Sequence, residues 1–73
     1  MSSEELKTEK LWPVLVETVH ALVLYPNHKA YTRDHILPDK PETTPMDLAV
    51  RLGMPLGEAI VILAELASEK ASS

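Results

Sequence analysis

Residues 44–66 constrain the fold of this chain more than any other segment, because they predict two helices joined by a tight glycine turn. The first helix has a threonine at its cap, a proline at its first position and an aspartate three residues after the cap, an acidic form of the capping box. These residues are Thr44, Pro45 and Asp47. Gly53 can adopt the left-handed conformation that ends a helix. We therefore expect this helix over 45–52.

The second helix of the pair is expected over 55–69, with Pro55 in its first turn. Its apolar residues recur at steps of three and four, the seam spacing of paired helices. They are Leu56, Ala59, Leu63 and Leu66. The seam is widened into a broad apolar surface by Ile60, Val61 and Ile62. Such a helix needs a cover, either from its own chain or from a partner.

Two further helices are expected in the first part of the chain, over 3–11 and 13–25. Pro13 either kinks one long helix between these ranges or begins the second helix. From residue 12 to residue 25, apolar residues recur at three- and four-residue steps, which places them on one face of a helix. They are Trp12, Leu15, Val16, Val19, Leu22 and Val23.

A linker over 26–43 is predicted to follow, because Pro26 cannot continue the preceding helix. Linkers of this length in compact domains usually carry a function or a hidden structural element. Residues 32–37 favour a short helix capped by Thr32, with a short strand as the alternative. The chain is therefore predicted to be all-α, a single small helical domain of several short helices over 1–73.

The composition argues against nucleic acid as the default partner. Seven Lys and Arg stand against eleven Asp and Glu, which gives a formal net charge of −4. Non-specific binding to nucleic acid depends on cations placed against phosphates. A chain of 73 residues has a small core, and the absence of cysteine excludes disulfides as its support. Helices of a partner are the natural supplement.

Neither a signal peptide nor a membrane span is predicted. The first ten residues are polar and acidic, which does not fit a signal peptide. The longest apolar-rich run, over 11–26, is too short to cross a bilayer and contains Glu17 and His20. We therefore expect a cytoplasmic protein without membrane contact.

The C-terminal pair of helices contains a set of small and apolar residues at characteristic positions. They are Leu48, Ala49, Leu52, Gly53, Met54, Ala59 and Ile62. This skeleton, over about the last third of the chain, resembles the helix-turn-helix motif shared by many bacterial and archaeal regulators. The resemblance implies a helix-turn-helix-like hairpin whose second helix would enter the major groove of DNA. The chain ends shortly after this helix, so no wing is expected.

The outward positions of the second helix depart from a DNA-reading surface. They carry no Arg, Lys, Asn or Gln, the side chains that form bidentate bonds to bases. They are Pro55, Leu56, Gly57, Glu58, Ile60, Val61 and Ala64. Three glutamates of this helix, Glu58, Glu65 and Glu69, would also repel phosphate. An apolar surface of this kind is typical of a protein contact.

Metal, cofactor and catalytic sites find little support in the sequence. Glu17 and His20 form half of the Glu-x-x-His arrangement of a di-metal site, but no second such pair exists. A second cluster, of His28, Asp34 and His35, lies in the polar linker, where solvated side chains are the simpler interpretation. The chain has neither a cysteine nucleophile nor a glycine-rich phosphate loop, and its serines lie near the two ends. We expect no cofactor, no metal and no enzyme activity.

The sequence thus predicts a non-catalytic protein-interaction module that forms a homo-oligomer through apolar helix faces. The expected contact residues are Trp12, Leu15, Val19, Leu22, Leu56, Ile60, Val61 and Leu63. One alternative is a DNA-binding transcriptional regulator with an atypical surface made by Lys29, Arg33 and Lys40. Another is an accessory subunit of a basic partner protein.

Overall fold

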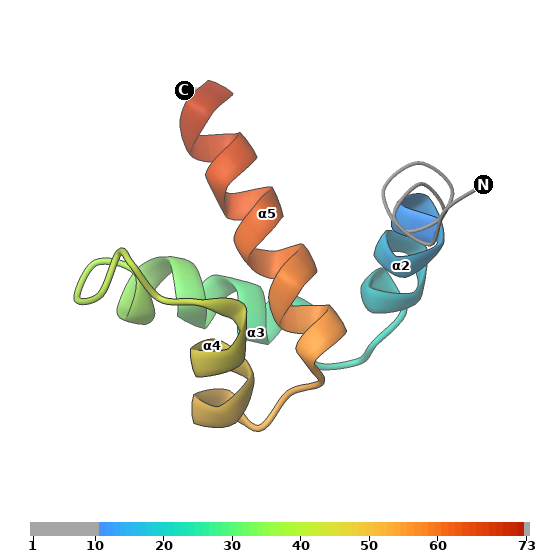
Figure 1. Ribbon diagram of the computed structural model, residues 1–73, viewed down its shortest axis with the longest axis horizontal. Helices are drawn as coiled ribbons and strands as arrows, with labels where there is room; N and C mark the ends of the chain where they lie inside the picture. Colours follow the sequence, from blue (N-terminus) through green and yellow to red (C-terminus); the bar gives the residue numbers. More distant parts are fainter. Residues whose placement is uncertain (1–10, 73) are drawn as a thin grey trace.

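The computed structural model describes residues 11–72, and the described chain is all-α, as the sequence predicts (Figure 1). Its elements are α2 (Leu11–His20), α3 (Tyr25–Tyr31), the π-helical turn η2 (Thr32–Ile36), α4 (Pro45–Leu52) and α5 (Leu56–Ser72). The helix expected over 3–11 lies outside the described residues, except for Leu11. No described helix combines the length and the apolar character needed to cross a membrane.

The long helix α5 is the centre of the fold, because α2, α3 and α4 all pack against it (Figure 1). The hydrophobic core lies between α5, α4 and the end of η2. It consists of Ile36, Leu48, Ala49, Met54, Ala59, Ile62 and Leu66. Much of the apolar seam predicted on the second helix is therefore covered by the chain itself. Leu56 is the member of that seam that stays exposed, at 42%.

The short helix α4 has the cap that its sequence predicts. The Thr44 side chain accepts a hydrogen bond from the Asp47 backbone N–H, and the Asp47 carboxylate accepts one from the Thr44 backbone N–H. Gly53 closes the helix with φ of +68°, a left-handed conformation that a residue with a Cβ adopts only at a cost. This turn brings α5 back against α4, where Leu48 is completely buried.

The helix predicted over 13–25 ends earlier, at His20, and the chain turns at residues 21–24. Pro26 disfavours one continuous helix through this turn, because its ring would clash with the Leu22 carbonyl four residues back. The expectation that Pro26 ends a helix is wrong, since it lies in the first turn of α3. A helix tolerates proline there because the first N–H groups have no intrahelical acceptor.

The predicted linker over 26–43 is also largely helical. α3 continues directly into η2, where the Leu37 N–H donates to the Thr32 carbonyl at 2.9 Å, a bond that spans five residues. Thr32 does not cap this turn but is buried, and its hydroxyl donates to the His28 carbonyl at 2.7 Å. Only residues 37–44 connect the end of η2 to α4.

Helix α2 packs closely on the first turns of α5. A Cβ added at Gly57 would lie only 3.1 Å from Leu15 Cδ1, so the two helices meet where α5 lacks a side chain. Val61 is one turn further along the same side of α5 and is completely buried, and Val19 of α2 is 2% exposed. These two valines are core residues and not part of an interaction surface.

Replacing Val61 with glutamate should unfold the protein, because an unpaired buried charge costs about 3–5 kcal/mol, comparable with the whole stability of a small domain. The matched control is Val50→Glu, since Val50 lies on α4 and is 76% exposed. We expect Val50→Glu to change the free energy of unfolding by less than about 0.5 kcal/mol. Circular dichroism with urea titration measures both, and a folded Val61→Glu variant would contradict the assignment of Val61 to the core.

Candidate functional site

The outward side of α2 carries an uncharged apolar stripe. Leu11 and Val14 are 48% and 56% exposed, and Thr18 follows them at a four-residue step. The Thr18 hydroxyl donates to the Val14 carbonyl at 2.9 Å, which satisfies its polar group inside the helix. Positions separated by three and four residues share one helix face. This face therefore offers mainly carbon atoms to solvent.

The turn at residues 21–24 extends this apolar surface. Three consecutive aliphatic side chains, Leu22, Val23 and Leu24, are exposed there, and Val23 has 90% of its surface in contact with solvent. A single exposed aliphatic residue is ordinary, but a contiguous group is typical of a contact site. We call residues 11–24 the contact segment.

The structure only partly preserves the contact surface predicted from the sequence. Leu22 and Leu56 are exposed, as that prediction requires. Four other predicted residues are half-buried, namely Trp12, Leu15, Ile60 and Leu63. Val19 and Val61 are buried, which corrects their assignment to a contact surface. The predicted apolar faces largely cover each other, because α2 packs against α5 in the same chain.

A row of carboxylates runs along another side of α5. Glu58, Glu65 and Glu69 are separated by seven and four residues, so they lie nearly in line on the helix. Each accepts a hydrogen bond from a side chain of α2 or α3. The sequence suggests that these glutamates repel phosphate. In the structure they hold the neighbouring helices of the same chain.

Glu58 is the most deeply buried of the three carboxylates, with 2% of its side chain exposed. The His28 Nδ1 lies 2.5 Å from Glu58 Oε2, and the histidine must donate because an ionised carboxylate only accepts. Glu58 is also in the first turn of α5, where the helix dipole favours a negative charge. The His28 ring is thereby committed to an internal partner.

Glu65 is the point at which α2, α3 and α5 meet. Its Oε2 accepts from His20 Nε2 at 2.7 Å and its Oε1 accepts from the Tyr25 hydroxyl at 2.5 Å, with Lys29 Nζ 3.5 Å from Oε1. Burial raises the pKa of the Glu65 carboxyl, but the bonds from Tyr25 and His20 and the nearby positive charge outweigh it. The net effect holds this pKa below its ordinary value, so the carboxylate is ionised at neutral pH.

Lys29 completes the cluster on α3. Its ammonium donates to Glu69 Oε2 at 2.6 Å and lies 5.9 Å from the centre of the Tyr25 ring. The bond to Glu69 raises the pKa of the Lys29 ammonium above its ordinary value, although burial acts in the opposite direction. Burial and the bond to Glu65 raise the pKa of the Tyr25 phenol.

The cations of the DNA-binding alternative are mostly engaged by carboxylates. Lys29 is paired with Glu69, and the Arg33 guanidinium donates to both oxygens of Asp34 at 2.9 and 3.1 Å. Lys40 lies in the connection before α4, outside α3 and η2, which carry Lys29 and Arg33. Phosphate binding needs cations that are not already neutralised by carboxylates. Lys29, Arg33 and Lys40 together therefore form a weak site for the phosphates of DNA.

The histidines considered as metal ligands have other contacts. His20 bonds to Glu65 rather than to Glu17, and the His35 ring packs against Tyr31 with ring centres 4.9 Å apart. Over residues 11–72, no group of three or more His, Cys, Asp or Glu side chains is placed to hold a metal ion.

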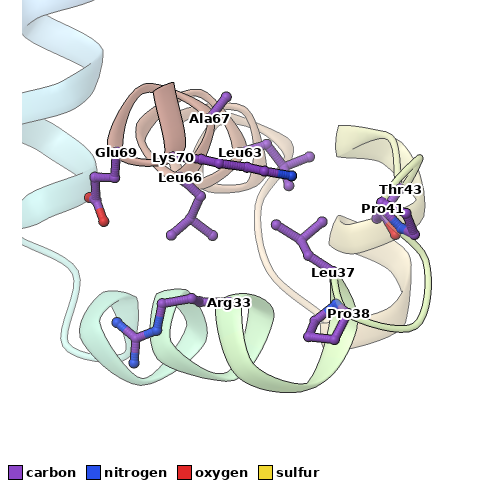
Figure 2. A pocket seen from close by; sticks show the side chains of 10 residues that line it. All are labelled: Arg33, Leu37, Pro38, Pro41, Thr43, Leu63, Leu66, Ala67, Glu69 and Lys70. Atoms are coloured by element: carbon purple, nitrogen blue, oxygen red, sulfur yellow. The ribbon is translucent and has the colours of Figure 1, made fainter. Parts of the chain in front are cut away.

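An apolar groove of about 710 Å³ was not anticipated from the sequence. It lies between α5 and the end of η2 with the following connection, and Figure 2 shows Leu37 and Leu66 pointing into the space between them. The other lining residues are Arg33, Pro38, Pro41, Thr43, Leu63, Ala67, Glu69 and Lys70. The proline-containing connection forms one wall, and its path depends on contacts that no local pattern reveals.

Comparisons of the chain with protein-family models, with curated proteins and with solved structures found no match.

Stability should fall at alkaline pH through the cluster around Glu65. Because the pKa values of Tyr25 and Lys29 are raised in the folded state, their stabilising contribution is complete below the unfolded-state values, near 10, and is lost as the pH rises through the raised values. We expect the urea midpoint of the native chain to fall between about pH 9 and 11. The Tyr25→Phe variant, which has no phenol to ionise there, should lose less over this range.

The control is Tyr31→Phe, which removes a phenol whose ring packs against His35 instead of Glu65. Its pH dependence should follow that of the native chain more closely than the Tyr25→Phe curve does. Parallel curves for the native chain and Tyr25→Phe would contradict the role of Tyr25.

Proposed function

We propose that this chain is a non-catalytic protein-interaction module that associates with copies of itself through the contact segment. One observation supports this most directly: five of the nine large hydrophobic side chains that are exposed over residues 11–72 lie in a single stretch of the chain. They are Leu11, Val14, Leu22, Val23 and Leu24. Removing such side chains from water contributes roughly 25 cal/mol for each Å² of apolar surface buried.

A second copy suits this surface better than a charged partner does. Within the contact segment the ionisable side chains are Glu17 and His20, and His20 is bonded to Glu65. A surface with little charge neither selects an oppositely charged partner nor repels its own copy. Two identical copies meet most simply about a two-fold axis, with the same patch on both sides.

A basic partner protein is less well supported. Such a partner would need available carboxylates, and Glu58, Glu65 and Glu69 on α5 already accept hydrogen bonds from His28, Tyr25 and Lys29. The row of carboxylates on α5 is therefore a poor docking site for a basic protein. This favours self-association over the accessory-subunit hypothesis.

The size of α2 limits the strength of the contact. A helix of 10 residues is about 15 Å long, which is short for an interface that buries about 800 Å² on each partner. We therefore expect a dimer that forms at micromolar concentration. The assignment of a non-catalytic role rests on the sequence, which lacks an activated nucleophile and a phosphate-binding glycine loop.

Charge introduced into the contact segment should dissociate the dimer without unfolding the chain. Val14→Glu and Val23→Glu each place a carboxylate on an exposed apolar surface, and each should weaken association about tenfold or more, because an unpaired charge is costly to bury between two copies. Sedimentation equilibrium measures association, and circular dichroism checks the fold.

Val50→Glu is the matched control, since it makes the same substitution at an exposed valine on α4. It should leave the dissociation constant unchanged. A native chain that is strictly monomeric at micromolar concentration would contradict the proposal. Salt-sensitive binding to duplex DNA in place of self-association would instead support the regulator hypothesis.

A further inference from the structure

The exposed turn at residues 21–24 is held at both ends by one carboxylate. His20 is the residue immediately before the turn, and its Nε2 donates to Glu65 Oε2 at 2.7 Å. Tyr25 is the residue immediately after the turn, and its hydroxyl donates to Glu65 Oε1 at 2.5 Å. Each end of the turn therefore binds a different oxygen of the same side chain on α5.

Local interactions alone define this turn weakly. It contains neither glycine nor proline, the residues that most strongly favour particular turns. Its backbone bonds are Ala21 N–H to Thr18 O at 3.2 Å, Leu22 N–H to Val19 O at 3.0 Å and Tyr25 N–H to Leu22 O at 3.2 Å, and the Leu24 carbonyl accepts from the His28 N–H at 2.8 Å. Three consecutive aliphatic residues would be expected to collapse onto the protein surface. Instead they remain exposed, between two side chains anchored to α5.

We propose that Glu65 is a positioning residue that fixes the turn in the conformation that exposes Leu22, Val23 and Leu24 for self-association. This inference rests on the proposed function above, and it adds a means of control at the same surface. The ionised carboxylate accepts from both anchors at once. When it is protonated, or replaced by glutamine, one of its two polar atoms becomes a donor, so one anchor would have to accept instead of donate, and neither bond is then strengthened by a negative charge.

The groups that face Glu65 agree with an ionised state. His20 approaches from α2, Tyr25 and Lys29 approach from α3, and Glu69 lies one turn further along α5, where it is bonded to Lys29. Donors and a cation therefore outnumber the single neighbouring carboxylate. Since the pKa of Glu65 is lowered in the folded state, the anchoring is complete at neutral pH and is lost as the pH falls through this lowered value.

The first test measures the turn itself by hydrogen exchange, at a concentration where the chain is monomeric. The Leu22 and Tyr25 amides should exchange about tenfold faster in Glu65→Gln than in the native chain, as expected when a hydrogen bond to a charged group is lost. The Ile62 amide in the core of α5 is followed beside them, because it reports a change in global stability, and the rates at the turn are compared with its rate. Unchanged relative rates would overturn the proposal.

Glu69→Gln is the matched control, because it makes the same change one turn further along α5, at a carboxylate that pairs with Lys29 but with neither end of the turn. It should leave the relative rates of both amides unchanged. If Glu65→Gln does not fold, Tyr25→Phe provides the same test, since it keeps the ring and removes only the anchoring hydroxyl. Unchanged relative rates in that variant would likewise overturn the proposal.

The second test measures self-association by sedimentation. Glu65→Gln should weaken the dimer about tenfold relative to Glu69→Gln, and the native dimer should weaken more than the Glu65→Gln dimer as the pH falls below about 4. Faster exchange together with equal dissociation constants for the two variants would overturn the link between the turn and association. A monomeric native chain would overturn the proposed function, while the exchange result alone would still decide whether Glu65 holds the turn.

Discussion

The fold depends on one row of carboxylates that is satisfied inside the molecule. Helix α3 has no buried residue, so apolar packing alone does not explain its place on α5. Hydrogen bonds from His28, Tyr25 and Lys29 to the glutamates of α5 supply the attachment. Charge-assisted bonds of this kind are stronger than neutral ones, and a buried carboxylate without its partner is costly. The polar contacts therefore set the positions of the helices around the apolar core.

Three sides of α5 carry different kinds of side chain, and each side packs against a different helix. The side with Gly57 and Val61 packs against α2, the side with Ile62 faces the core with α4, and the row of glutamates bonds to α3. A helix that is covered on three sides has little surface left for an external partner. Among its large hydrophobic residues α5 exposes Leu56, whereas α2 and the turn after it expose five.

Sequence reasoning succeeded where the signals were local and failed where distant residues decided the outcome. The capping box at Thr44 and the left-handed Gly53 are read from a few neighbouring residues, and both are present. The turn after His20 depends on contacts with Glu65, which is 45 residues away in the sequence. Periodicity also could not tell whether Val61 faces the core or a partner, because both environments favour the same aliphatic residue.

The bare backbone at Gly57 determines how closely α2 and α5 approach each other. It therefore affects which substitutions the exposed surface of α2 can tolerate during evolution. With Leu15 Cδ1 only 3.1 Å from the place of a Cβ, even a methyl group there requires a shift of the leucine or of the helix. The exposed residues of α2 can be exchanged for other aliphatic residues without disturbing the packing of α2 on α5. A substitution at Gly57, which is not one of these residues, instead acts on that packing itself, because Leu15 or α2 must move by a few tenths of an ångström to admit it.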